Sequence, residues 1–281
     1  RLDYDESLEI RNAKRLAVEN AADAYIAQIK AADIKTGKKV AVIGAGPAGL
    51  AAATFLRRNG VAVTVMERKE KPYGIINYVI PEFRISDEMI ARDFALAEKA
   101  GVDFKFGVNE NFDLKALKEA YDYVIIAIGA WDKGVSPVKE GSEKITDSLA
   151  FLESYKATKG KVDLGKKVVI VGGGDVAMDC SRAAKRCAGV EDVTIVYRRT
   201  KAFMPAEREE IELAEADAVS FKELLAPVKY DGKILTCEVM VLGDKDASGR
   251  RGIKGTGEMV AIEADTVIGA TGATIQKGFL K

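Results

Sequence analysis

Short apolar runs alternate along this chain with longer segments whose apolar residues recur at helical spacing. The apolar runs predict buried strands, because the strands of a parallel sheet are covered on both faces. The segments with helical spacing predict helices, and the alternation of the two predicts an α/β fold. Strands are predicted at 40–43, 61–66, 102–106, 121–130, 193–197, 219–223, 234–242 and 258–263, and helices at 47–58, 86–100, 114–120, 148–159, 176–188 and 207–216.

The same plan occurs twice in the chain. Residues 38–49 are matched by residues 166–177, and the run Asp-x-Val-Ile-x-Ala-x-Gly-Ala at 122–130 recurs at 265–273. Each copy begins with a strand, a glycine turn and a helix, and ends on an apolar strand that closes on Gly-Ala. The second copy also contains three further predicted strands, at 219–223, 234–242 and 258–263, with turns predicted at 231–232 and 249–257. We therefore expect two similar domains, the second with an additional small β region.

The first glycine turn has the spacing of a dinucleotide site, G-x-G-x-x-G, at Gly44, Gly46 and Gly49. The first glycine permits the tight turn, the second lets the backbone approach a pyrophosphate, and the third lets the helix pack close to the strand. The free N–H groups at the helix N-terminus then face the phosphates. The alternative is an ordinary βαβ unit with a glycine-rich turn. The second turn has Gly172, Gly174 and Ala177 at the matching positions.

The two copies differ in charge at the end of the second strand. Glu67 follows the strand at 61–66, near the offset expected for an acid that binds the adenosine ribose hydroxyls. A carboxylate there suits FAD or NAD and would repel a 2′-phosphate. In the second copy Tyr197 takes that place, and Arg198 and Arg199 follow it. Guanidinium groups suit the 2′-phosphate of NADP(H), although a solvated basic turn is the alternative.

Composition narrows the possible functions. The chain has 281 residues with 43 Lys plus Arg and 43 Asp plus Glu, so nothing points to a nucleic-acid or anionic-membrane partner. No run approaches 18 apolar residues, and no N-terminal signal peptide is visible. The absence of histidine excludes a Ser-His-Asp triad, a His-ligated metal and a histidine base. Three cysteines without a C-x-x-C pair favour a reducing, cytoplasmic setting.

These motifs together resemble one family over essentially the whole chain. The chain resembles the FAD/NADPH module shared by the small subunit of bacterial glutamate synthase, the matching domains of dihydropyrimidine dehydrogenase, and the selenate reductase iron–sulfur subunit. The segments that carry the resemblance are residues 42–50, 80–84, 171–180, 196–199, 204–205 and 264–268. Residues 239–243 and 249–251 are most similar to the selenate reductase branch.

The resemblance implies two Rossmann-like dinucleotide-binding domains of the three-layer ββα type, with the NADP domain inserted in the FAD domain. It implies FAD on the first turn and NADP(H) on the second, with no catalytic and no metal-binding side chain in the chain itself. Arg84 is then expected near the flavin nucleotide, and Gly272 near the nicotinamide end. The expected cofactor-binding residues are Gly44, Gly46, Pro47, Ala48, Gly49, Glu67, Arg84, Gly129, Gly172, Gly174, Asp175, Val176, Ala177, Arg198, Arg199 and Gly272.

The resemblance also implies parts that this chain does not carry. Relatives have a cysteine-rich iron–sulfur domain upstream, so residues 1–36 are expected to be a helical connector, followed by an FAD domain at 37–130 and an NADP domain at 131–273. Residues 274–281 would complete the FAD domain only in part, without the last strand and helix of the family. We therefore expect this chain to be a piece of a longer protein and to hold FAD weakly or not at all.

The expected function is an NADPH-dependent flavin oxidoreductase module. Hydride would pass from NADPH to FAD, and electrons would leave to iron–sulfur centres outside this chain or to a partner reductase or synthase domain. Two alternatives remain at this point, which are a stand-alone NADPH reductase of a small acceptor and a non-catalytic nucleotide-binding assembly module. The sequence does not identify the terminal acceptor or the oligomeric state.

Overall fold

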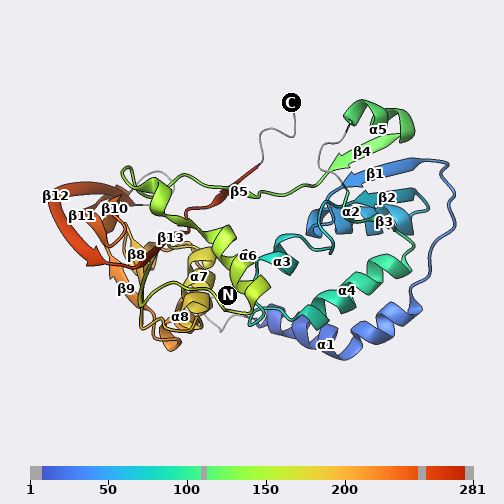
Figure 1. The fold of residues 1–281 in the computed structure, drawn as a ribbon. Helices are drawn as coiled ribbons and strands as arrows, with labels where there is room; N and C mark the ends of the chain where they lie inside the picture. The colour runs from blue at the N-terminus through green and yellow to red at the C-terminus, as the bar shows by residue number, and fades with distance from the viewer. Residues whose placement is uncertain (1–7, 109–112, 246–250, 276–281) are drawn as a thin grey trace. The chain divides into compact units, whose positions relative to one another are not determined.

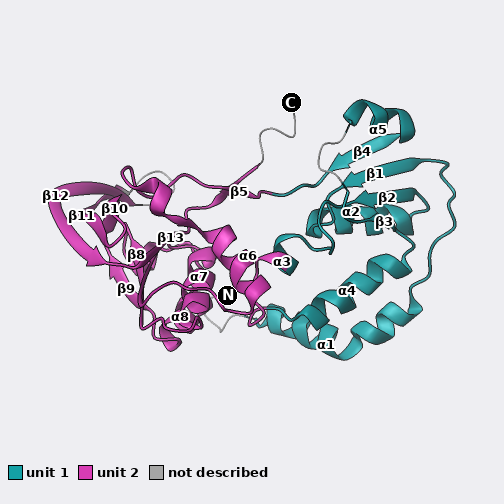
Figure 2. Cartoon of the chain, in the orientation of Figure 1, with its two compact units in different colours: residues 1–77, 85–129 teal, residues 78–84, 130–281 magenta. Residues whose placement is uncertain are grey.

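The computed structural model describes residues 8–108, 113–245 and 251–275. The chain divides into two compact units, which Figure 2 shows in teal and magenta. The first unit comprises residues 1–77 and 85–129, and the second comprises residues 78–84 and 130–281. Among the described residues, no helix is both long enough and apolar enough to cross a membrane. Each unit has its own parallel sheet and its own hydrophobic core.

The first unit is built on a four-stranded parallel sheet with the order β3-β2-β1-β4 (Figure 1). Its core joins the apolar faces of β1, β2 and α2 to four aromatic rings, those of Tyr73, Phe94, Phe104 and Phe106. The sequence alternates strand and helix here, which produces parallel strands with helical crossovers. The elements are α1 (Ile10–Gln28), β1 (Lys39–Ile43), α2 (Pro47–Arg58), β2 (Ala62–Met66), α3 (Ile75–Tyr78), α4 (Asp87–Lys99), β3 (Asp103–Lys105), α5 (Leu114–Ala120) and β4 (Tyr123–Ile126).

The second unit has a five-stranded parallel sheet with the order β6-β13-β7-β8-β9. In Figure 1, helices α6, α7 and α8 lie on one face of this sheet and the antiparallel sheet β10-β11-β12 lies on the other. The elements are β5 (Asp132–Lys133), η1 (Ser142–Lys144), β6 (Thr146–Asp147), α6 (Ser148–Thr158), β7 (Lys167–Val171), α7 (Asp175–Lys185), β8 (Asp192–Tyr197), η2 (Lys201–Phe203), α8 (Arg208–Ala216), β9 (Ser220–Glu223), β10 (Leu225–Tyr230), β11 (Ile234–Lys245), β12 (Arg251–Glu263), β13 (Thr266–Gly269) and β14 (Ala273–Thr274).

The predicted α/β class with parallel dinucleotide-type sheets is confirmed. The three-layer arrangement is found in the second unit, where Val169 and Val196 of the parallel sheet share a core with Leu235 and Ile262 of the antiparallel sheet. Among the described residues the first unit has no such antiparallel sheet. In the second unit this sheet lies between β9 and β13, whereas in the first unit the described residues between β3 and β4 form only α5. The functional division into an FAD domain at 37–130 and an inserted NADP domain at 131–273 stays a prediction.

The antiparallel sheet differs from the prediction in two places. The segment predicted as a turn at 249–257 is strand from Arg251 onward, because residues 253–255 pair with residues 240–242 of β11. The sequence also gave no prediction of β10, whose Pro227 lies at a register shift in the pairing with β11. A proline removes one ladder donor, which makes such a strand hard to recognise from its sequence. The expected completion of the FAD domain by residues 274–281 lies largely outside the described residues.

The connector predicted at 1–36 contains α1, and its C-terminal part is held to the first unit by a buried arginine. Arg57 of α2 is 9% exposed. Its Nε donates to the carbonyl of Gly101 at 2.9 Å, and its Nη1 donates to the carbonyl of Ala32 at 2.6 Å. The amide of Lys35 donates to the carbonyl of Gly60 at 3.0 Å in the same region. Residues 32–35 are therefore a docked part of this unit.

Replacing Arg57 with alanine should release this segment. The change removes two charge-assisted hydrogen bonds, so we expect it to lower the free energy of unfolding by about 2–3 kcal/mol. Urea denaturation measures the change. The matched control is Arg58→Ala on the exposed side of the same helix, which should change stability little. Equal losses for the two variants would contradict the role given to Arg57.

Candidate functional site

A cleft of about 840 Å³ opens in the second unit at the carboxyl ends of its parallel strands. Its floor is the glycine turn after β7, and Tyr197 and Arg198 at the end of β8 form one side. Parallel sheets bind their ligands at this edge. The remaining lining comes from residues 134–137, 205, 226–227 and 270–274. The cleft is thus made where the sequence predicts the NADP site.

The glycines of this turn have two different reasons to be glycine. A Cβ at Gly172 would lie 2.4 Å from the carbonyl oxygen of Ala270, and the residue has φ +153°, so the fold itself requires glycine there. A Cβ at Gly174 would meet nothing closer than the Pro205 ring at 3.9 Å. Gly174 has extended backbone and precedes α7 without a side-chain cap. The fold therefore leaves open space beside Gly174, next to the N–H groups of the helix N-terminus.

The first unit repeats this arrangement at its own glycine turn. A Cβ at Gly44 would lie 2.5 Å from the carbonyl oxygen of Ala127, and one at Gly49 would lie 2.0 Å from that of Gly44. At Gly46 an added Cβ would meet nothing within 4 Å. Gly46 also precedes its helix, α2, without a side-chain cap. In both units, the glycine expected to approach a pyrophosphate is the one at which an added Cβ would not clash with the protein itself.

Glu67 lies against the first glycine turn with its carboxylate pointing at the backbone. Glu67 is only 8% exposed. Its carboxylate accepts hydrogen bonds from the amides of Ala45 at 2.7 Å and Lys69 at 2.9 Å. An ionised carboxylate accepts about four hydrogen bonds, so it retains capacity for a ribose hydroxyl. Its negative charge is fixed beside the turn.

Tyr197 occupies the equivalent place in the second unit. The strand registers establish the equivalence, since Ile43 pairs with Met66 just before Glu67, and Val171 pairs with Val196 just before Tyr197. The Tyr197 ring packs on Gly173, where an added Cβ would lie 2.6 Å from a ring carbon. Its hydroxyl donates to the carbonyl of Phe203 at 3.1 Å. The second turn is therefore covered by a neutral ring where the first has a carboxylate.

The two arginines after Tyr197 point to different places. Arg198 is exposed and lines the cleft. Arg199 is 8% exposed, and its Nε donates to the carbonyl of Arg251 at 3.0 Å in β12. Its Nη1 is buried and has no hydrogen-bond partner among the described residues. Of the predicted pair, the structure brings only Arg198 to the cleft.

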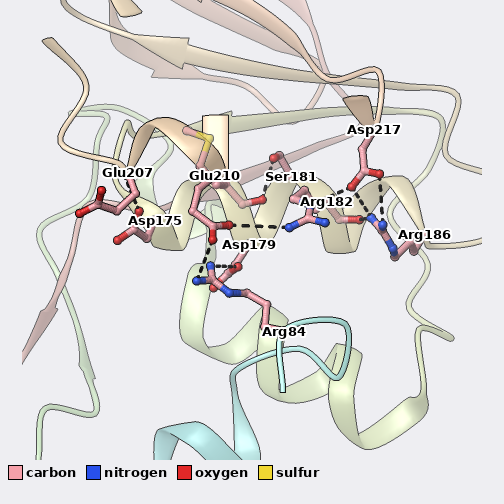
Figure 3. A network of polar contacts seen from close by, with 10 residues as sticks. Arg84, Asp175, Asp179, Ser181, Arg182, Arg186, Glu207, Glu210 and Asp217 are labelled. Atoms are coloured by element: carbon pink, nitrogen blue, oxygen red, sulfur yellow. Dashed lines mark hydrogen bonds and ion pairs between the residues drawn. The ribbon is translucent and has the colours of Figure 1, made fainter. Parts of the chain in front are cut away.

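Arg84 lies in the second unit, where two carboxylates hold its guanidinium (Figure 3). Nη1 is 2.7 Å from Asp179 of α7, and Nη2 is 3.0 Å from Glu210 of α8. Burial raises the pKa of Asp179, and the Arg84 charge opposes that shift. The expected contact between Arg84 and the FAD nucleotide stays a prediction.

The other expected residues take varied positions. Val176 and Gly272 line the cleft of the second unit, whereas Ala177, in the first turn of α7, is fully buried. Asp175 also lines the cleft, and its carboxylate accepts a hydrogen bond from the amide of Glu207 at 3.0 Å. In the first unit, Pro47 and Ala48 are exposed in the first turn of α2, and Gly129 follows β4 with φ +70°. No sequence motif marks residues 134–137 and 226–227, which lie in irregular or short segments.

Comparison with known proteins places this chain among oxidoreductases. Residues 38–280 match the family described as "Pyridine nucleotide-disulphide oxidoreductase". The chain is 44% identical over 276 residues to the protein named "Putative oxidoreductase YgfK" from Escherichia coli (strain K12), a match that covers 97% of this chain and 27% of the relative. It is 35% identical over 262 residues to the "Glutamate synthase [NADPH] small chain" of the same organism, covering 85% of this chain and 54% of the relative.

The fold also matches solved structures. FprA from Mycobacterium tuberculosis superposes with a TM-score of 0.71 at 22% identity, over 84% of this chain and 71% of FprA. At that identity the match concerns the fold alone. The chain spans 27% of one curated relative and 54% of the other.

These comparisons confirm the predicted family, including its likeness to glutamate synthase small chains. They do not confirm the predicted similarity to the selenate reductase branch. The match spans both glycine turns and both parallel sheets. The chain belongs to the pyridine nucleotide-disulphide oxidoreductase family.

Proposed function

We propose that this chain is the NADPH- and FAD-binding part of a larger oxidoreductase. The observation that carries the proposal is the open space at Gly46 and Gly174, because the fold itself leaves room there for a side chain that both copies lack. Each space adjoins an uncapped helix N-terminus, where N–H groups and the helix dipole favour an anion. The chemistry that the two cofactors supply when bound is hydride transfer from nicotinamide to flavin.

The second unit is proposed to bind NADPH. The amides at the start of α7 would hold the pyrophosphate, and the cleft beside them is large enough for a nucleotide. Arg198 lines that cleft and would bind the 2′-phosphate through charge-assisted hydrogen bonds. Tyr197 favours the same ligand, because it leaves no carboxylate to repel the phosphate. Arg199 would support Arg198 from the side of β12, to which its Nε is bonded.

The first unit is proposed to bind FAD. Glu67 is fixed against the glycine turn by two backbone amides, so its carboxylate is pre-oriented for an unphosphorylated ribose. The close approach at Gly44 and Gly49 holds the start of α2 at the carboxyl end of β1. This part of the proposal therefore depends on the same steric pattern as the NADPH site.

The electron acceptor is proposed to lie outside this chain. The sequence has no C-x-x-C pair, and all three cysteines are buried and free. Among the described residues, no cluster of histidine, cysteine or acidic side chains could hold a metal ion. An iron–sulfur domain or subunit, followed by a terminal reductase or synthase domain, fits a two-electron flavin donor. The free cysteines support a cytoplasmic setting.

Arg198→Ala should select against NADPH while sparing NADH. Loss of a charge-assisted contact to the 2′-phosphate costs about 1.5–3 kcal/mol, which is about 10- to 100-fold in NADPH affinity. Titration calorimetry of the full-length protein with both nucleotides measures this ratio. Arg199→Ala serves as comparison and should weaken NADPH less. Equal losses for NADPH and NADH would rule out recognition of the phosphate by Arg198.

Gly174→Ala should impair nucleotide binding without disturbing the fold. The added methyl group meets no protein atom closer than 3.9 Å, so the unfolding midpoint should stay within error while NADPH affinity falls by about tenfold or more. Gly172→Ala is the contrasting variant, because it clashes with the Ala270 carbonyl and should destabilise the second unit. Unchanged NADPH binding in Gly174→Ala would show that no phosphate lies against this turn.

Anaerobic mixing of NADPH with the flavin-loaded full-length protein tests the proposed reaction. We expect the visible absorption of the oxidised flavin to bleach in a single turnover. Bleaching followed by rapid reoxidation with a small acceptor alone would favour a stand-alone reductase. Binding of NADPH without any bleaching would favour a non-catalytic assembly module and overturn the proposal.

A further inference from the structure

The loop after Glu67 contains a tyrosine whose backbone has a conformation that favours glycine. Tyr73 has φ +73°, and in the described part of the first unit it is the only non-glycine residue with a positive φ. A bulky side chain rarely adopts this left-handed conformation, because its Cβ crowds the neighbouring backbone. Such residues persist only where surrounding contacts hold them, and they are concentrated at functional sites.

The side chain of Tyr73 is anchored on α4. Its hydroxyl donates a hydrogen bond to the carboxylate of Asp93. Its ring meets the ring of Phe94 edge-on, at a centroid distance of 6.5 Å and an interplanar angle of 80°, and packs against the core of the first unit. Burial and the Asp93 carboxylate raise the pKa of the Tyr73 hydroxyl, so the hydroxyl stays protonated and remains a donor. Two consecutive residues of α4 therefore hold the strained residue in place.

The strained backbone brings the amide of Tyr73 to the first glycine turn. This amide donates to the carbonyl of Ala45 at 2.7 Å. Ala45 is fully buried, and its own amide donates to the Glu67 carboxylate at 2.7 Å. Buried backbone groups need such partners. The peptide groups on both sides of Ala45 are therefore held by residues outside the turn.

The hydrogen bond from Tyr73 also sets the direction of the next amide in the turn. The carbonyl of Ala45 and the N–H of Gly46 belong to one planar trans peptide group, in which they point in opposite directions. Because the carbonyl points at the Tyr73 amide, the Gly46 N–H points away from it. Gly46 is the residue at which the fold leaves open space at the start of α2.

The second glycine turn has the same hydrogen bond from a different source. Gly173 matches Ala45 in the repeat and is buried, and its carbonyl accepts a hydrogen bond from the amide of Ala206 at 3.1 Å. Ala206 does not have a positive φ, so the second turn obtains this contact without strain. The contact thus recurs at both turns, although in the first it requires a strained residue. This recurrence indicates that the direction of this carbonyl matters to the turn.

We propose that Tyr73 is a positioning residue of the FAD site, which holds the peptide group between Ala45 and Gly46 so that the Gly46 N–H is presented to the pyrophosphate. This inference rests on the proposed function of the first unit. The backbone of Tyr73 does the positioning, and its side chain keeps that backbone in the left-handed conformation. A glycine adopts this conformation without an anchor, whereas an alanine has neither the anchor nor the freedom.

The test compares Tyr73→Ala with Tyr73→Gly in the full-length protein. The affinity for FAD, measured by quenching of flavin fluorescence, should fall about tenfold or more in Tyr73→Ala. Tyr73→Gly should recover most of this loss, to within about threefold of the wild-type affinity. Hydrogen–deuterium exchange of a peptide covering residues 68–77, in protein freed of FAD, should be about tenfold faster or more in Tyr73→Ala than in the wild type. The Kd for NADPH should not change in either variant.

Lys159→Ala and Lys159→Gly are the matched controls. Lys159 also has a left-handed backbone, with φ +53°, but it ends α6 in the second unit. Both of its variants should leave the affinity for FAD unchanged. The controls therefore separate a general effect of relieving or retaining backbone strain from an effect on the first glycine turn.

Three outcomes would overturn the inference alone. A loss of FAD affinity in Tyr73→Gly as large as that in Tyr73→Ala would assign the effect to the ring or the hydroxyl. A lower unfolding midpoint in Tyr73→Ala with wild-type FAD affinity would leave Tyr73 a purely structural role. A tenfold loss in Tyr73→Gly would be decisive even if Tyr73→Ala did not fold. Absence of FAD binding in the wild-type protein would instead overturn the proposed function, whatever the exchange measurement gives.

Discussion

The position of both helix N-termini depends on the close contact between each glycine turn and the strand beside it. Gly44 lies against the Ala127 carbonyl, and Gly172 lies against the Ala270 carbonyl, at distances that exclude any Cβ. These contacts hold the start of α2 and of α7 at the carboxyl edge of their sheets. The helix N–H groups consequently face open space at Gly46 and Gly174, where an anion gains most from the helix dipole. The nucleotide chemistry proposed for the protein follows from this steric constraint.

The two copies share this arrangement but differ at the end of their second strand and in the surroundings of their glycine turns. The first copy holds a carboxylate at Glu67, and the second has the neutral ring of Tyr197 followed by Arg198 at the cleft. The helices that follow the two turns also differ, since residues 177–184 of α7 are buried while Phe55 of α2 is 68% exposed. Phe83 and Arg84 contribute to this difference, because they contact charged side chains of α7. The repeated fold thus has two glycine turns with different charge and different surroundings.

The sequence predicts the frame well because glycine spacing and apolar runs are local signals. The turns at Gly44–Gly49 and Gly172–Ala177 and the positions of Glu67 and Tyr197 follow from spacing along one βαβ unit. The separation of Arg198 from Arg199 could not be predicted, since it depends on the carbonyl of Arg251, far along the chain. The ion pairs of Arg84 could not be predicted either, because its partners on α7 and α8 are distant in sequence and no local sequence pattern indicates such a pair. Residues 134–137 and 226–227 reach the cleft through tertiary packing alone.

The most direct test of the central claim is a crystal structure of the full-length protein with NADPH bound. We expect the pyrophosphate beside Gly174 at the start of α7, and the 2′-phosphate within hydrogen-bond distance of the Arg198 guanidinium. NADPH bound instead against Glu67 at the first glycine turn, or a 2′-phosphate in solvent away from Arg198, would contradict the account.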